Sequence, residues 1–337
     1  MKFKYLLIVP LLVVAFMIFY IVAGNQEAES IVALPSAAQA DPGAPVIDRE
    51  RLLNDVRTLA APAFEGRQTG SEGSRKAQAW LAGRFAEAGI APYGGSYLHP
   101  FSYTKTSIKG LVLPGRPFQT VVPNAVNIVG HIRGSTNPSR VLLVSAHYDH
   151  LGVREGKVYP GADDNASGVG AMLAIAAWFK AHPPQHTIVF AAFDAEEAGL
   201  RGASALLDKP PFPREQLVMN LNLDMVSHND NNEIYVAGTS YTPVLKALVA
   251  QAAARSAVQV KPGHDKAALM SPGAEDWTQG SDHGVFHDAG LPFLYFGVED
   301  HAHYHHPGDT FEHINQDFYV KVASLLIDVA AILDRQL

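Results

Sequence analysis

Apolar residues along this chain recur with two different periods. Runs with helical spacing predict helices over residues 48–59, 71–88, 168–179, 242–255 and 314–336. Short apolar runs bounded by turn residues predict strands over residues 98–104, 126–133, 141–146, 187–193, 218–223, 234–236 and 291–296. Because strands alternate with helices throughout, we expect an α/β fold, with a mixed, largely parallel central β-sheet sandwiched by helices.

Two local expectations concern neighbouring segments. The strand over residues 126–133 is expected to pair with the strand over residues 141–146, because only a polar turn over residues 134–140 separates them. Residues 64–67 form a predicted loop with a charged pair, Glu65 and Arg67. Such a pair lies on the surface more often than in a site.

The first 46 residues differ in pattern from the rest. Lys2 and Lys4 precede an apolar run over residues 5–23, about the length that spans a bilayer. This predicts a signal anchor or signal peptide with an N-terminal hydrophobic helix over residues 1–23, a flexible linker over residues 24–46 and one folded domain over residues 47–337. Because positive charge precedes the run, the domain is expected to be exported to the periplasmic or extracellular face, and to be inner-membrane anchored if the segment is not cleaved.

Composition narrows the chemistry that the domain can carry. The chain has 337 residues, 47% of them hydrophobic, which is enough for one large core. The net charge is -7 and no run of lysine or arginine is present, so no nucleic-acid partner is expected. With no cysteine and 15 histidines, any metal ion must be held by His, Asp and Glu side chains.

Histidines and carboxylates stand close to the carboxyl ends of the predicted strands or just before a helix. In chain order they are His147 with Asp149, Asp164, Glu196 with Glu197, Asp224 and His305. Ligands of open α/β sheets bind beyond these strand ends, so we expect the side chains to converge. The set matches the nitrogen and oxygen ligands of hydrolytic zinc sites, and it also suits manganese or cobalt. Each residue alone has an ordinary explanation, since an aspartate before a helix is often a cap.

Six short motifs, in this order, resemble the zinc-dependent aminopeptidases of the M28 class over roughly residues 120–315. They are His147-Tyr-Asp149, residues 161–168 (GADDNASG), residues 194–199 (DAEEAG), Leu223-Asp224-Met225, Ser281-Asp282-His283 and residues 305–310 (HHPGDT). The resemblance implies a zinc-exopeptidase-like fold and an M28-like peptidase domain with two zinc ions per chain. One ion would be held by His147 and Asp224 and the other by Glu197 and His305, with Asp164 bridging the two.

The resemblance also implies roles for residues around the ligands. Glu196 is expected to be the general base for the water that two metal ions activate, and Asp149 to fix the tautomer of His147. Ser281 or Asp282 is expected to support His305. Asp309 lies in the motif that begins with His305. Some family members place a tyrosine before the Ser-Asp motif, and Tyr304 is expected to substitute for it here. The Asp164-Asn165 peptide bond is expected to be cis.

These expectations describe a zinc aminopeptidase, a metallo-exopeptidase that removes the N-terminal residue from peptides. A glutaminyl-cyclase-like activity, which related proteins carry on a similar scaffold with one zinc, and a carboxypeptidase or amide-hydrolase activity are the alternatives. A non-catalytic receptor or scaffold is a third reading, disfavoured because every ligand position and the base are filled. Side-chain specificity and oligomeric state have no signature in the sequence.

Overall fold

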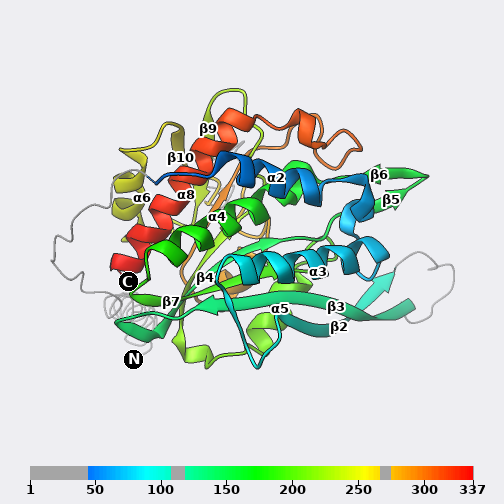
Figure 1. Ribbon diagram of the computed structural model, residues 1–337, viewed down its shortest axis with the longest axis horizontal. Helices are drawn as coiled ribbons and strands as arrows, with labels where there is room; N and C mark the ends of the chain where they lie inside the picture. The colour runs from blue at the N-terminus through cyan, green and yellow to red at the C-terminus, as the bar shows by residue number, and fades with distance from the viewer. Residues whose placement is uncertain (1–44, 108–117, 266–274, 337) are drawn as a thin grey trace, which may run out of the picture. The chain divides into compact units, whose positions relative to one another are not determined.

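The computed structural model describes residues 45–107, 118–265 and 275–336 (Figure 1). One compact unit over residues 42–335 contains all of these except Gln336. The predicted hydrophobic helix and nearly all of the predicted linker lie outside the described residues. Within the described part of the chain, no helix is both long and apolar enough to cross a membrane.

The helices and strands follow the hydrophobic pattern closely. The helices are α2 (Arg49–Leu59), α3 (Glu72–Glu87), α4 (Gly168–Ala181), α5 (Arg201–Asp208), α6 (Leu245–Ala253), α7 (His283–Asp288) and α8 (Gln316–Gln336), with short helical turns η1 (Pro62–Arg67), η2 (Ala162–Ser167), η3 (Arg214–Gln216) and η4 (Phe311–His313). The strands are β1 (Ala91–Pro92), β2 (Leu98–Ser107), β3 (Phe118–Ile132), β4 (Asn137–His147), β5 (Gly152–Arg154), β6 (Lys157–Tyr159), β7 (His186–Phe193), β8 (Leu217–Leu223), β9 (Glu233–Ala237), β10 (Gln259–Pro262) and β11 (Phe293–Gly297). Every helix and strand predicted from residue 48 onward is present.

The first two helices begin where the sequence supplies a capping side chain. Asp48 accepts a hydrogen bond from the backbone N–H of Arg51 at the start of α2, and Ser71 accepts one from the backbone N–H of Ser74 at the start of α3. Each bond satisfies a donor that the first helical turn leaves unpaired, typically worth about 1 kcal/mol.

Nine strands form one mixed sheet in the order β1-β3-β7-β4-β8-β11-β9-β10, with β2 paired to β3. The four central strands β7, β4, β8 and β11 are parallel to one another. Across the described sheet, parallel and antiparallel pairings are equal in number, four of each. The prediction of a mixed sheet is confirmed, but only half of its pairings are parallel: three join the central strands and the fourth joins β9 to β10 at one edge.

The predicted pairing of β3 with β4 is wrong, because β7 lies between them. β3 pairs with β7 in antiparallel register, Val129 opposite Ala191, and β4 pairs with the other edge of β7 in parallel register, Leu143 opposite Val189. All eight residues of β7 are buried. A strand buried along its whole length belongs inside a sheet, and this requirement outweighs the short connection between β3 and β4.

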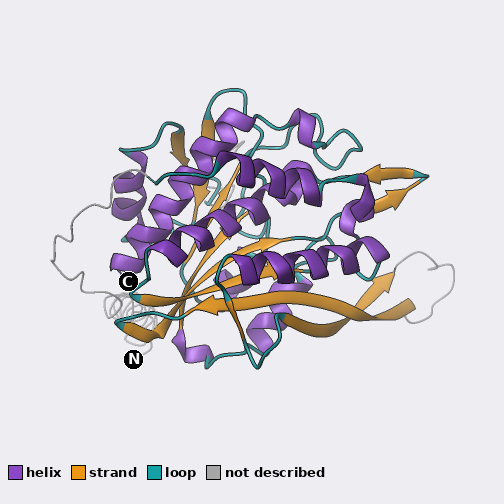
Figure 2. Cartoon of the chain, viewed as in Figure 1, coloured by secondary structure: helices purple, strands orange, loops and turns teal. Residues whose placement is uncertain are grey.

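Helices cover both faces of the sheet (Figure 2). On one face Leu143 of β4 packs in a core with Leu206 of α5 and Phe286 of α7. Its neighbour Leu142 is equally buried and points to the opposite face, which α4 covers. Burial on both faces explains why the central strands read as continuous apolar runs.

The central strands also decide where the site lies. Because β7, β4, β8 and β11 are parallel, their carboxyl ends meet at one edge of the sheet. The residues at these ends are therefore brought together along one edge. They are residues 194–197 after β7, 147–150 at the end of β4, 224–225 after β8 and 298–305 after β11.

Candidate metal centre

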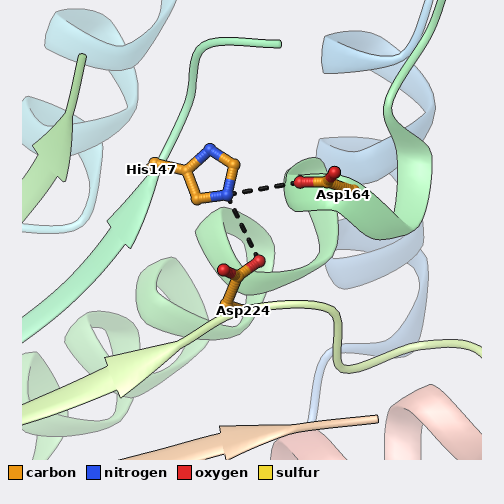
Figure 3. A group of neighbouring side chains, drawn as sticks. All are labelled: His147, Asp164 and Asp224. Carbon is orange, nitrogen blue, oxygen red and sulfur yellow. Dashed lines mark hydrogen bonds and ion pairs between the residues drawn. The ribbon is translucent and has the colours of Figure 1, made fainter. Parts of the chain in front are cut away.

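A first cluster of metal-capable side chains consists of His147, Asp164 and Asp224 (Figure 3). His147 is the last residue of β4, Asp224 follows β8, and Asp164 lies in η2, just before α4. The Nε2 atom of His147 is 3.3 Å from Asp164 Oδ1 and 3.2 Å from Asp224 Oδ1. All three side chains are buried, so one imidazole nitrogen and two carboxylates converge away from water.

A second cluster consists of His150, Asp164 and Glu197, with His305 beside it. His305 Nε2 lies 3.1 Å from Asp164 Oδ2 and 3.5 Å from Glu197 Oε1. Asp164 thus belongs to both clusters, one oxygen facing each. The five predicted ligands come together as expected, but His150, which the sequence reasoning missed, lies among them.

Histidines of the two clusters lower the pKa values of the Asp164 and Glu197 carboxyl groups. Burial alone would raise the pKa of Asp164, but His150, His147 and His305 together hold it well below its usual range. Burial also opposes ionisation of Glu197, but the close approach of the His150 and His305 rings lowers its pKa to about 2. Both carboxylates are therefore ionised at neutral pH, the state that a metal ligand requires.

Glu196 has the opposite electrostatic environment from its neighbour Glu197. Burial raises the pKa of Glu196 well above its usual value, and the nearby Asp282, Asp224 and Asp149 raise it further, against the lowering effect of His147. Glu196 belongs to neither cluster, although it lines the same cavity. A carboxyl group with a raised pKa beside ligands is the arrangement expected of an acid–base residue.

Asp149 contacts His147, the residue that it was expected to orient, and it also contacts Glu196. His147 Nδ1 lies 3.1 Å from the main-chain oxygen of Asp149, whereas the nearest carboxylate oxygen is 3.8 Å away. That carboxylate accepts a hydrogen bond from the backbone N–H of Glu196 instead. Asp149 therefore orients the His147 ring through its carbonyl and the Glu196 backbone through its side chain.

Asp309 holds the turn that presents Asp164. Its carboxylate accepts hydrogen bonds from the backbone N–H groups of Asp163 and Asp164, at 2.9 and 3.1 Å. The side chain of Asp163 instead accepts a hydrogen bond from the Ser227 hydroxyl and contacts His301 Nε2. Asp164 is therefore the carboxylate that faces the histidines of the two clusters. The peptide bond between Asp164 and Asn165 is cis, as the resemblance implied.

Ser281 and Asp282 were expected beside His305, but both lie on the side of the first cluster. Ser281 accepts a hydrogen bond from Asn222 on β8, and Asp282 is fully buried without a hydrogen-bond partner among the described residues. The reason is topological, since α7, which follows these two residues, packs against β8 and β11, and Asp224 of the first cluster follows β8 directly. Tyr304 does adjoin His305, with ring centroids 3.9 Å apart.

The expectation that Arg67 lies on the surface is wrong. Its side chain is fully buried, and its guanidinium donates hydrogen bonds to four main-chain oxygens. The acceptors are Tyr148 O, Leu59 O, Pro160 O and Gly161 O, at 2.6–2.9 Å. Arg67 thereby ties the end of β4 to the chain that leads into η2. Burial lowers its pKa to about 10, against the raising effect of Asp164 and other carboxylates, so it stays charged at neutral pH.

The two clusters open into a cavity of about 280 Å³. Its described lining residues are His147, Asp164, Glu196, Glu197, Asp224, Met225, Glu275, Asp276, Trp277, Gly280, Tyr295, Val298, Asp300, Tyr304 and His305. The donor atoms at its base are only nitrogen and oxygen, and Glu197 Oε1 is buried without a hydrogen-bond partner among the described residues. These donors fit divalent cations such as zinc.

A helix-covered mixed sheet with paired metal-capable clusters at the carboxyl ends of its parallel strands defines a class of α/β metalloproteins. The model of peptidase family M28 matches residues 127–330, more than half of the chain, and the chain belongs to this family. Aminopeptidase YwaD of Bacillus subtilis (strain 168) is 34% identical over 188 residues, which are 52% of this chain and 37% of that protein. The chain spans 37–42% of the length of YwaD and of two other curated relatives at 33% identity.

Solved structures share the fold at lower identity. BSAP, a zinc aminopeptidase from Bacillus subtilis, superposes with a TM-score of 0.63 at 18% identity, over 85% of this chain and 95% of that one. A glutaminyl cyclase of Bacteroides thetaiotaomicron superposes with a TM-score of 0.65 at 19% identity, over 85% of this chain and 98% of that one. The architecture is therefore that of zinc aminopeptidases, and it is shared with glutaminyl cyclases.

Proposed function

We propose that this protein is a metal-dependent aminopeptidase that binds two zinc ions and removes the N-terminal residue of peptides. The observation that carries the proposal is that Asp164 offers one oxygen to each of two clusters, while Glu196 stands beside both and belongs to neither. Manganese or cobalt could take the same nitrogen and oxygen ligands. Membership of peptidase family M28 supports the reaction class.

The environment of each residue determines whether it binds metal or transfers a proton. Bound zinc ions would polarise the scissile carbonyl and lower the pKa of a water molecule. His147, Asp164 and Asp224 would hold one ion, and Glu197 and His305 would hold the other with Asp164. Glu196 takes the proton of the attacking water and passes it to the leaving amine, a role that its raised pKa suits.

The charge of the cavity supports action at the N-terminus of a peptide. Glu275, Asp276 and Asp300 line the cavity above the clusters, and its described lining contains no lysine or arginine. An acidic wall attracts the free ammonium of an N-terminal residue and repels the carboxylate that a carboxypeptidase has to hold. This favours an aminopeptidase over the carboxypeptidase alternative.

Substitution of Glu196 tests the proposed mechanism. The Glu196→Gln variant is expected to keep two zinc ions but to lose roughly 10²–10⁴-fold in kcat on aminoacyl chromogenic substrates, because only the proton acceptor is removed. The matched control is Glu155→Gln, at an exposed position between β5 and β6. If the unaltered protein releases no N-terminal residue from any substrate, or if Glu196→Gln is as active as the control, the proposal fails.

A glutaminyl-cyclase-like activity is the second candidate, because glutaminyl cyclases share the fold with a TM-score of 0.65. Conversion of an N-terminal glutamine into a ring with release of ammonia, but of no amino acid, would favour it. The first cluster argues for the peptidase, since a scaffold with one zinc does not need His147 and Asp224 as a second set of ligands.

We also propose that the domain works outside the cytoplasm. Support comes from Lys2 and Lys4 before the apolar run over residues 5–23, a pattern typical of a signal anchor or signal peptide. Fractionation of cells that express the whole chain tests this. A periplasmic or membrane-bound active domain is expected, and a cytoplasmic one contradicts it.

A further inference from the structure

His150 lies in the second cluster, although the family motif gives it no role. It follows His147 by three residues, just past the end of β4. Its side chain is fully buried, whereas that of His305 is 38% exposed. A buried histidine normally has hydrogen-bond partners for its ring nitrogens or binds a metal ion.

Within the described part of the chain, no hydrogen bond accounts for the His150 ring. Its Nδ1 atom lies 2.9 Å from Glu197 Oε1 and 3.6 Å from Asp164 Oδ2. Neither ring nitrogen, nor Glu197 Oε1, has a partner in hydrogen-bonding geometry among the described residues. The Nδ1 atom of His150 and Oε1 of Glu197 thus lie 2.9 Å apart without a hydrogen bond between them, an arrangement that two ligands of one metal ion would have.

His305 and Asp164 lie beside this pair of atoms. His150 Nδ1 lies 2.9 Å from Glu197 Oε1 and 3.6 Å from Asp164 Oδ2. His305 Nε2 lies 3.5 Å and 3.1 Å from the same two oxygen atoms. With zinc–ligand bonds of about 2.0–2.1 Å, the donors of a tetrahedral site lie roughly 3.3 Å apart. Two of the four contacts are shorter than this separation and two are longer, and the donor atoms of His150, Asp164 and Glu197 all lie within 4.8 Å of one another, as ligands of one ion do.

The surrounding backbone leaves room for the imidazole. Gly161 has a φ of +59°, and a Cβ atom at this position would lie 2.6 Å from His150 Cγ. Arg67 donates a hydrogen bond to the carbonyl of Gly161 and fixes this close approach. Only glycine combines this backbone conformation with this contact at low cost.

We propose that His150 is a ligand of the second metal ion, which it binds through Nδ1 together with Asp164, Glu197 and His305. The proposal rests on the metal-dependent function proposed above and extends its ligand set by one residue. Coordination through Nδ1 leaves the ring proton on Nε2. The second ion would then have four protein ligands, three of them largely buried.

X-ray absorption spectroscopy of the unaltered protein loaded with two equivalents of zinc tests the proposal without a substitution. Three imidazoles, those of His147, His150 and His305, are expected over the two ions, against two without His150. The measurement reports the ligands directly and does not depend on activity.

Zinc titration of variants gives an independent readout. His150→Asn keeps a polar atom near the position of Nδ1, and His306→Asn is the matched control at an exposed histidine next to His305. His150→Asn is expected to weaken one of the two binding steps by more than about 100-fold, since even loss of an outer residue typically costs 10–100-fold. The other step and the control are expected to be unchanged.

The outcomes separate this proposal from the function on which it rests. The role of His150 would be overturned if the unaltered protein binds two ions through only two imidazoles. It would also be overturned if the Kd values of both binding steps of His150→Asn lie within about threefold of those of the control. Either result leaves the proposed function intact. One ion or none in the unaltered protein would overturn the two-metal function, and the role of His150 with it. If His150→Asn does not fold, the spectroscopic count decides.

Discussion

Glu196 and Glu197 are neighbours in the chain, yet their surroundings shift their pKa values in opposite directions. Glu197 meets the histidines of the second cluster, and Glu196 meets other carboxylates. The sequence predicted this division only through a resemblance, because pattern and spacing do not say which charges will surround a side chain. Roles at the residue scale are therefore set by three-dimensional neighbours.

Asp282 is a second residue whose charge depends on its surroundings. Burial and the nearby charge of Asp224 raise its pKa to about 7, against the lowering effect of His147. The folded state then binds a proton at this carboxyl between its ordinary pKa of 3.8 and about 7, where the unfolded state does not. The contribution of Asp282 to stability is therefore lost as the pH rises through this range.

The Asp282→Asn variant is expected to stabilise the metal-free protein at pH 8 by on the order of 1–3 kcal/mol, because it removes a buried charge that has no hydrogen-bond partner among the described residues. At pH 4 the difference from the unaltered protein should largely vanish. Urea unfolding at both pH values measures this. Asp208→Asn, at an exposed position, is the control, and a gain for Asp282→Asn that is equal at both pH values contradicts the prediction.

At the scale of elements, local pattern was a reliable guide to helices and strands but not to their neighbours. The capped starts of α2 and α3 and the buried runs of β4, β7 and β8 are encoded by nearby residues. The insertion of β7 between β3 and β4 is not, since it depends on which strands must be covered on both faces. The site residues could be placed at strand ends before their arrangement was known.

The connections between elements depend on Arg67, which joins η1 to the end of β4 and to the chain before η2. The Arg67→Met variant is expected to lower the free energy of unfolding by at least about 3 kcal/mol, because four buried carbonyls lose a charged donor. Arg75→Met, at an exposed arginine of α3 that pairs with Glu72, should cost about 1 kcal/mol or less. Urea unfolding compares the two, and equal losses would contradict the prediction.

At the scale of the whole molecule, stability is expected to depend on metal. The clusters gather several buried carboxylates that repel one another unless a cation lies between them. An ion bound at 100 times its Kd stabilises a protein by about 2.7 kcal/mol, and each kcal/mol is worth roughly 2–4 °C in Tm. Removal of metal with a chelator is therefore expected to lower Tm by about 5 °C or more.

Differential scanning calorimetry measures this change. Zinc added back in excess over the chelator should restore the original Tm, whereas magnesium, which prefers oxygen ligands, should not. A Tm that is unaffected by chelation, in protein from which the metal has demonstrably been removed, contradicts the prediction.

The sequence by itself determined the helices and strands, the all-nitrogen-and-oxygen chemistry of the site and, through its motifs, the family. These features rest on local periodicity and on short runs of residues, which can be read without knowing the fold. Only the tertiary structure decided the strand order, the burial of Arg67 at the centre of four carbonyls and the position of His150 beside Glu197. Contacts between residues far apart in the chain depend on how the layers pack, and no local pattern encodes them.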